Sequence, residues 1–124
     1  MAKFTPGELE VMRILWRHGE LKPAEIQEKF PRPIKNPALR SYLSILVAKG
    51  DVVRRRRGKA FYYKTKTKRQ SALRSMFREL AHVFYDGSMK AVLFHLVQSE
   101  KLSPDEVAEL KRLADGETTS KKSN

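Results

Sequence analysis

Two groups of residues in this chain have the types and spacing that bind a polyanion. The first is a run of basic side chains from Arg54 to Lys59. The second combines an arginine with short polar side chains, at Asn36, Arg40, Ser41 and Ser44. Guanidinium groups donate to phosphate oxygens and to guanine, and hydroxyl groups reach base edges or phosphates. Together they predict a nucleic-acid-binding surface.

The distribution of charge supports this prediction. The chain has 124 residues, with 26 Lys and Arg against 14 Asp and Glu, a formal net charge of +12. Residues 1–67 hold 16 basic and 6 acidic residues (+10), whereas residues 68–124 hold 10 and 8 (+2). A basic region followed by a nearly balanced one is typical of a nucleic-acid reader joined to a second functional region. Charge alone does not separate DNA from RNA or a membrane surface.

Several function classes are disfavoured by what the sequence lacks. Without cysteine there is no disulfide, no thiol nucleophile and no Cys-based metal site. The three histidines have no metal-ligand spacing, and no P-loop, Gly-rich dinucleotide turn, HExxH pattern or nucleophile elbow occurs. We therefore expect a binding protein rather than an enzyme, with no cofactor and no metal. No apolar run reaches the roughly 18 residues of a membrane span, which predicts a cytoplasmic protein without membrane insertion.

Three short helices are predicted in the first 50 residues. The first begins at Thr5-Pro6-Gly7-Glu8, a capping box, and ends at Gly19. The second begins at Lys22-Pro23, although Lys22 is a poor cap, and ends before Pro31. The third begins with Asn36 as its cap and ends at Lys49-Gly50. This arrangement is typical of a helix-turn-helix.

The third helix carries the predicted base-reading residues. At about 100° per residue, Leu39, Leu43, Leu46 and Val47 share the core face. The face opposite is small or polar, and the helix is expected to enter the major groove of DNA. Its candidate DNA-binding residues are Asn36, Ala38, Arg40, Ser41 and Ser44. For the two serines taken alone, simple solvation of an exposed face is an equally weighted alternative, but the helix-turn-helix context favours contact with DNA.

A β hairpin is predicted after the third helix. Its strands are Val52–Arg56 and Ala60–Lys64, which completes a winged helix. Since strand residues alternate between two faces, we expect about two of its basic side chains to contact phosphate. The candidates are Arg54, Arg56, Arg57 and Lys59. The aromatic residues Phe61, Tyr62 and Tyr63 either stack on bases or pack in the core, and we expect at least two of them to be core.

The remaining residues are predicted to form a helical dimerisation region. We assign residues 1–67 to the winged helix, 68–114 to this region and 115–124 to a disordered polar tail. The later helices have too few apolar residues for an independent core, so a second copy is expected to complete it; packing within the chain is the alternative. The candidate dimerisation residues are Leu73, Met76, Phe77, Leu80, Phe84, Val92, Leu93, Leu96, Val107 and Leu110.

The fold class expected is mainly α with a small β hairpin, a winged helix-turn-helix domain followed by helices. The function expected is that of a dimeric, sequence-specific repressor of transcription that binds a palindromic operator in double-stranded DNA. The alternative is an RNA- or ribosome-associated module in which the tyrosines stack on bases. Comparing duplex DNA with structured RNA at equal salt separates the two.

The sequence also resembles the penicillinase-repressor (BlaI/MecI) family of winged-helix repressors. The resemblance runs from about Phe4 to Leu113 and is carried by Thr5–Met12 with Leu15-Trp16, Leu39–Leu43 with Leu46–Gly50, Gly58–Tyr63, Asp86–Ser88 and Leu102–Leu110. It implies a homodimer that binds palindromic operators, linked to antibiotic-resistance or stress regulation. It also implies inactivation through a membrane-bound sensor protease pathway.

Three departures from the family pattern qualify what the resemblance implies. Pro37-Ala38 stands where family members often carry Ser or Thr, so base preference is expected to differ. The family's cleavage pair falls on His95-Leu96 instead of Asn-Phe, which questions cleavage at this bond. The Cys-rich tail of the copper-responsive branch is absent.

Overall fold

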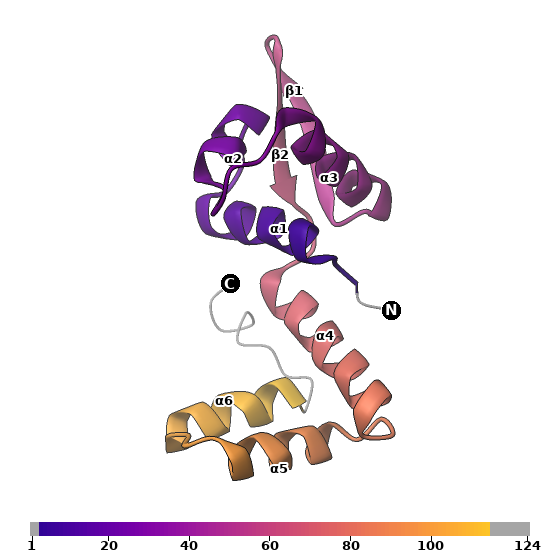
Figure 1. The fold of residues 1–124 in the computed structure, drawn as a ribbon, viewed down its shortest axis with the longest axis vertical. Helices are drawn as coiled ribbons and strands as arrows, with labels where there is room; N and C mark the ends of the chain where they lie inside the picture. The colour runs from indigo at the N-terminus through magenta and orange to yellow at the C-terminus, as the bar shows by residue number, and fades with distance from the viewer. Residues whose placement is uncertain (1–2, 115–124) are drawn as a thin grey trace. The chain divides into compact units, whose positions relative to one another are not determined.

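The computed structural model describes residues 3–114, which form six helices and one hairpin (Figure 1). Their order is α1 (Pro6–His18), α2 (Pro23–Lys29), α3 (Asn36–Lys49), β1 (Val52–Arg57), β2 (Ala60–Thr65), α4 (Arg69–Phe84), α5 (Met89–Ser99) and α6 (Pro104–Ala114). The chain divides into two compact parts. We call Phe4–Lys68 the N-terminal unit and the helices from Arg69 onward the C-terminal unit. The expected fold class, mainly helical with one small hairpin, is confirmed.

The start and end of α1 follow directly from its sequence. The Glu8 N–H donates to Thr5 Oγ1 at 3.3 Å, and the Thr5 N–H donates to Glu8 Oε1 at 3.2 Å, which is the predicted capping box. Gly19 ends the helix with φ 82°, a backbone angle that side chains disfavour. The Lys49 ammonium at the end of α3 donates to the buried Glu8 carboxylate at 2.8 Å. This bond joins the first and third helices.

The helix α3 begins differently from the prediction. Its N-cap is Lys35, not Asn36: the Leu39 N–H donates to the Lys35 carbonyl at 3.1 Å, so Asn36 is already helical. The Asn36 side-chain oxygen accepts instead from Arg40 Nε at 3.3 Å, one turn along the helix. In α2 the N-cap is Lys22, whose side chain makes no capping bond because an ammonium has no acceptor.

The core of the N-terminal unit lies between the three helices and the base of the hairpin. Its fully buried side chains come from the three helices and β1 and include Met12, Leu15, Ile26, Leu39, Leu43, Leu46 and Val52. Val47, which was expected on the core face, is 36% exposed. It lies about 75° around the helix from the centre of the buried stripe, at about 100° per residue, which places it at the edge of the core.

The hairpin is antiparallel, and each strand is one residue longer than predicted. Leu21 adds a short bridge to β2, because its N–H and carbonyl pair with the carbonyl and N–H of Tyr63. Tyr63 is buried, Tyr62 is half-buried and Phe61 is 37% exposed. The expectation that at least two of these aromatic residues are core is therefore wrong. The hairpin extends beyond the helices, so only its base packs against them (Figure 1).

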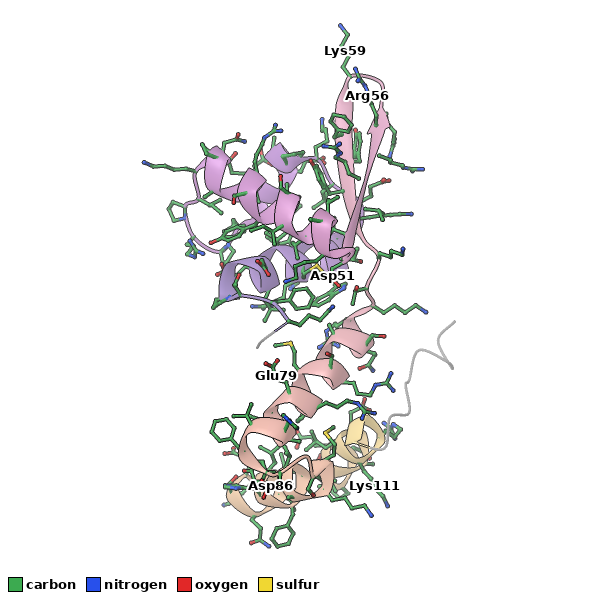
Figure 2. The ribbon with its side chains drawn as sticks, turned by 90° about the vertical axis from the view of Figure 1, so that its right-hand side faces the viewer. Asp51, Arg56, Lys59, Glu79, Asp86 and Lys111 are labelled. Atoms are coloured by element: carbon green, nitrogen blue, oxygen red, sulfur yellow. The ribbon has the colours of Figure 1, made fainter. Side chains whose placement is uncertain are left out.

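A small polar cluster closes the base of the hairpin. The indole of Trp16 donates to the Thr67 carbonyl at 2.9 Å, and the Thr67 hydroxyl donates to Asp51 Oδ1 at 2.6 Å. The N–H groups of Lys66 and Thr67 donate to the Asp51 carbonyl at 2.8 and 3.2 Å. Asp51 is buried at the end of α3, where Figure 2 labels it. These bonds attach the chain beyond β2 to α1 and to the start of β1.

In the C-terminal unit, α5 and α6 lie side by side and α4 packs on both (Figure 1). Ser88 caps α5, accepting from the Ala91 N–H at 3.0 Å, and Ser103 with Glu106 forms a capping box at the start of α6. The turn between α4 and α5 contains Asp86 and Gly87, both with positive φ. No described helix is long and apolar enough to cross a membrane. The predicted tail, residues 115–124, lies outside the described residues.

Candidate nucleic-acid interface

At about 100° per residue, Ser41 and Ser44 lie on the outer face of α3, whereas Ala38 and Arg40 lie on its opposite flanks. Asn36, Ala38, Arg40, Ser41 and Ser44 are all exposed and lie on its first three turns. The hydrogen bond to Asn36 uses one N–H of the Arg40 guanidinium, which has four others. The arrangement is a row of donors on the first turns of an exposed helix. Such a row fits the edges of bases in a major groove.

The wing, which we define as residues 52–65, sorts its arginines onto two faces. In the antiparallel register Arg54 lies opposite Tyr63, and Arg56 lies opposite Phe61. Directly paired residues share a face, so these four lie on the side that also carries the buried Val52. We call this the core-side face, because its base packs against the helices. Arg55 and Arg57 lie on the other side, the outer face, with Tyr62 and Lys64.

On the core-side face, Phe61 supports both arginines. The guanidinium carbons of Arg54 and Arg56 lie 4.3 and 5.7 Å from the centroid of the Phe61 ring. Arg56 Nε also donates to the Gly58 carbonyl at 3.1 Å. Figure 2 shows Arg56 and Lys59 at the far end of the hairpin, beyond the helices of the N-terminal unit. Two guanidinium groups and an ammonium are therefore exposed along this end of the wing.

On the outer face, one carboxylate binds both arginines. Arg55 donates to Glu20 Oε2 from Nε at 2.8 Å and to Oε1 from Nη2 at 3.1 Å. Arg57 donates to the same Oε1 at 3.2 Å and stacks on the Tyr62 ring, 4.4 Å from its centroid. The hydrogen bond from Arg55 lowers the pKa of Glu20 below its ordinary value, and the charges of Arg55, Arg57 and Lys64 add to this against a smaller opposing effect of burial. Glu20 is thus ionised at neutral pH.

The sequence prediction missed Glu20 and the supporting role of Phe61. Of the four predicted phosphate contacts in the wing, Arg54, Arg56 and Lys59 are exposed away from Glu20, whereas Arg57 is paired with it. Alternation along β1 does indicate two faces. Alternation does not reveal that Glu20, 35 residues before Arg55, lies beside the outer face. The bridge between Leu21 and Tyr63 places it there.

The predicted dimerisation residues divide into three groups. Five of them line one small apolar cavity inside the C-terminal unit together with Met89, namely Phe77, Val92, Leu93, Leu96 and Leu110. Leu73, Met76 and Val107 are half-buried, whereas Leu80 and Phe84 are 40% and 72% exposed. Three further exposed apolar side chains were not predicted: Val83, Phe94 and Val97.

The bond between His95 and Leu96 lies inside α5. The His95 carbonyl accepts from Ser99 Oγ at 2.9 Å, and the Leu96 carbonyl accepts from the Glu100 N–H at 3.0 Å. Tyr85 Oη lies 2.8 Å from His95 Nδ1 and ties this helix to the end of α4. Over residues 3–114, no group of three or more His, Asp or Glu side chains is placed to hold a metal.

Three helices followed by a basic hairpin define this chain as a winged-helix DNA-binding protein. Comparison with known proteins then gives the family. The family model of the penicillinase repressor matches residues 4–116, and the chain belongs to that family. It is a family of DNA-binding transcriptional repressors rather than of enzymes. The resemblance described from the sequence is thereby confirmed.

Two relatives and two solved structures illustrate the match. The penicillinase repressor of Bacillus licheniformis is 22% identical, over 97% of this chain and 95% of its own length. The methicillin resistance regulatory protein MecI of Mammaliicoccus sciuri is 24% identical, over 90% and 92%. The DNA-binding domain of the repressor BlaI has a TM-score of 0.52 at 22% identity, over 57% of this chain and 88% of its own. E. coli MarR in complex with operator DNA has a TM-score of 0.50 at 22% identity, over 92% and 75%.

Proposed function

We propose that this protein is a dimeric transcriptional repressor that binds a palindromic operator in double-stranded DNA. The observation that carries the proposal is the exposed row of donors on α3, next to a wing whose core-side face carries Arg54 and Arg56. The N-terminal unit is the DNA-binding part. Family membership supports a repressor, and a fold shared with an operator-bound MarR supports a DNA target.

In the proposed complex α3 lies in the major groove. Arg40, Ser41 and Ser44 donate to base edges, and Ala38 contacts a thymine methyl group. Asn36 and the N–H groups of the first turn bind a phosphate, since that end of a helix carries partial positive charge. Arg54, Arg56 and Lys59 bind the sugar-phosphate backbone and fix the orientation of the helix.

We propose that the C-terminal unit is the dimerisation part, and that its partner is a second copy of this chain. Its exposed side chains include Leu80, Val83, Phe84, Phe94 and Val97, and burying them supplies the free energy of association. A two-fold axis through this contact presents two α3 helices to one duplex. Half-sites about one DNA turn apart, in palindromic order, then match the protein.

Arg40→Ala tests base readout. Bound sequences are first selected from a random duplex pool, and affinities for the selected operator and for random DNA are then measured at one salt concentration. We expect the variant to lose about 1–3 kcal/mol of preference for the operator, because the guanidinium reads a base. Arg78→Ala, which removes the same charge from exposed α4, is the matched control. An unchanged preference in Arg40→Ala would remove base readout from the proposal.

The RNA-binding alternative needs aromatic side chains available for stacking. Tyr63 is buried, and Tyr62 carries the Arg57 guanidinium on its ring, which leaves Phe61 alone on a face already occupied by two arginines. This arrangement favours duplex DNA. Titrating duplex DNA and a structured RNA at equal salt is the test, and tighter binding to RNA would favour the alternative.

We propose that the regulated genes serve antibiotic resistance or stress. The names of the two relatives support the first of these, since they refer to penicillinase and to methicillin resistance in those proteins. In this proposal a sensor protease pathway releases the repressor, with His95–Leu96 as the cleaved bond. Because that bond lies within α5, cleavage requires α5 to unwind first. Immunoblotting after β-lactam exposure tests this: a fragment ending at His95 supports it, and an intact chain with derepressed genes contradicts it.

A further inference from the structure

The run Arg54–Arg57 does not act as a single basic patch in this structure. Two of its members lie on the core-side face over Phe61, and two are bound by Glu20 on the outer face. We propose that Glu20 is a specificity-determining residue that withholds Arg55 and Arg57 from DNA phosphates. The inference rests on the DNA-binding function proposed above and concerns how that same surface discriminates between sites.

Glu20 is held in place by the backbone on both sides. It follows Gly19, which ends α1, and precedes Leu21, whose N–H and carbonyl both pair with Tyr63 at 3.0 and 2.8 Å. Its side chain is 17% exposed, whereas those of Arg55 and Arg57 are 59% and 54% exposed. A carboxylate fixed to a helix end and a strand therefore restrains two longer side chains that would otherwise extend into solvent.

The geometry of the hydrogen bonds to Glu20 favours pairing of both arginines with this carboxylate. Arg55 binds through two parallel N–H groups, the fork arrangement that suits a carboxylate. Arg57 adds a third bond to the same group and gains a second restraint from the ring of Tyr62. The bond from Glu20 raises the pKa of Arg55 above its ordinary value, because the carboxylate favours the charged guanidinium. An isolated exposed ion pair holds weakly, but three bonds on one carboxylate form a network.

The two faces matter differently in specific and non-specific complexes. When α3 lies in the major groove, the orientation of the wing relative to DNA is fixed. The core-side face of the wing then lies on the same side as the helices. Arg55 and Arg57 then point away from that side. In a non-specific complex the protein samples many orientations, so any unpaired arginine would contact phosphate. Pairing them with Glu20 therefore lowers non-specific affinity more than operator affinity.

Glu20→Gln tests this with little change of shape. For random duplex DNA, we expect the salt dependence of affinity to steepen by about 0.9 per arginine released, up to about 1.8 for each wing. Between 50 and 200 mM salt the variant would lose on the order of tenfold more affinity per wing than the wild type. Affinity for the selected operator should change much less, so the preference for the operator falls.

Two further variants separate the role of Glu20 from net charge. Glu28→Gln removes the same charge from an exposed position on α2 and should leave the salt dependence near that of the wild type. Adding Arg55→Gln and Arg57→Gln to Glu20→Gln should restore the wild-type salt dependence, whereas the same pair of changes in the wild-type background should have little effect. Thermal melts followed by circular dichroism confirm that each variant is folded.

Two results would overturn the proposal. One is an equal change in the salt dependence of affinity in Glu20→Gln and Glu28→Gln, which would mean that only net charge matters. The other is a loss of salt dependence when Arg55 and Arg57 are replaced in the wild type, which would mean that both already contact phosphate. Failure of the underlying function is separate: it is the absence of any operator preference in the wild-type protein.

Discussion

The two units of the molecule differ in where their apolar side chains lie. The N-terminal unit buries residues from all three helices and the hairpin around one core, and its surface is basic, with Ile45, Val47 and Phe61 exposed by 36–40%. Among the described residues of the C-terminal unit only Ala72, Ala81 and Val92 are buried, while Phe84 and Phe94 are 72% and 65% exposed. The first unit is complete as one chain. The second exposes the apolar surface that a second chain would cover.

This difference fits the separate roles that we propose for the two units. A closed core holds α3 and the wing in a fixed relation, which base readout requires because base contacts depend on sub-ångström geometry. In the proposed dimer, the exposed apolar surface of the C-terminal unit supplies association, which requires buried area rather than fixed donors. The charge follows the same division, at +10 in residues 1–67 and +2 in residues 68–124.

The largest expected effect is on the core of the N-terminal unit. Leu43 is 1% exposed, and Leu43→Ala should lower the free energy of unfolding by about 2–5 kcal/mol, through lost burial and a cavity. Urea unfolding followed by the fluorescence of Trp16, the one tryptophan of the chain, reports this unit. Leu80→Ala, the same change at a 40% exposed position of α4, should barely move that transition. Equal shifts would show that the two units share one core.

The next effect concerns the exposed face of the C-terminal unit. Phe84→Ala should raise the dissociation constant of the dimer by tenfold or more, since each dimer loses two large apolar side chains worth about 1.5–3 kcal/mol each when fully buried. Sedimentation equilibrium measures it. Val53→Ala, a change in the half-buried base of the wing, is a control that should leave the dimer intact. A dimer unaffected by Phe84→Ala would place the contact elsewhere.

A smaller effect is expected at the polar cluster that closes the wing. Thr67→Val keeps the shape but removes the 2.6 Å bond to buried Asp51, which should cost about 1–3 kcal/mol. Trp16, whose indole donates to the Thr67 carbonyl, reports the change in its fluorescence. Thr65→Val in β2 is the matched control. Equal stability of the two variants would show that the polar cluster does not stabilise the N-terminal unit.

The smallest effect is a dependence of stability on pH. Burial raises the pKa of Glu8, but hydrogen bonds from Lys49 and Thr5 outweigh it and hold this pKa below its ordinary value of 4.5. A depressed folded-state pKa gives stability that is complete above the unfolded pKa and is lost as pH falls through the folded one. Unfolding free energies between pH 7 and pH 3 should therefore fall less steeply in Glu8→Gln. An equal fall in unfolding free energy with pH in the wild type and in Glu8→Gln would contradict this expectation.

Much of the fold follows from local sequence patterns. The capping box at Thr5 and the stop at Gly19 depend on neighbouring residues, and each was predicted. The cap of α3 was wrong because Asn36 has a second partner, Arg40, one turn further on. The prediction that Val47 lies on the core face was wrong because this residue lies at the edge of the apolar stripe, where tertiary packing decides burial.

The predicted site depended on both local and distant contacts. The row on α3 was predictable, because helical periodicity alone places Arg40, Ser41 and Ser44 away from the core. The division of the wing arginines was only half predictable. Strand alternation gives two faces, but which face is neutralised depends on Glu20, brought there by a bridge between Leu21 and Tyr63. Contacts so distant in sequence leave no periodic pattern.

The most direct test of the account is the binding of the full chain to two duplexes, the selected palindrome and the same duplex with one half-site scrambled. Stoichiometry by analytical ultracentrifugation and affinity at a fixed salt concentration are measured for both. We predict two chains on the palindrome and a large loss of affinity, through both half-site readout and dimerisation, when one half-site is scrambled. One chain per duplex with equal affinity for the two DNAs would contradict the account.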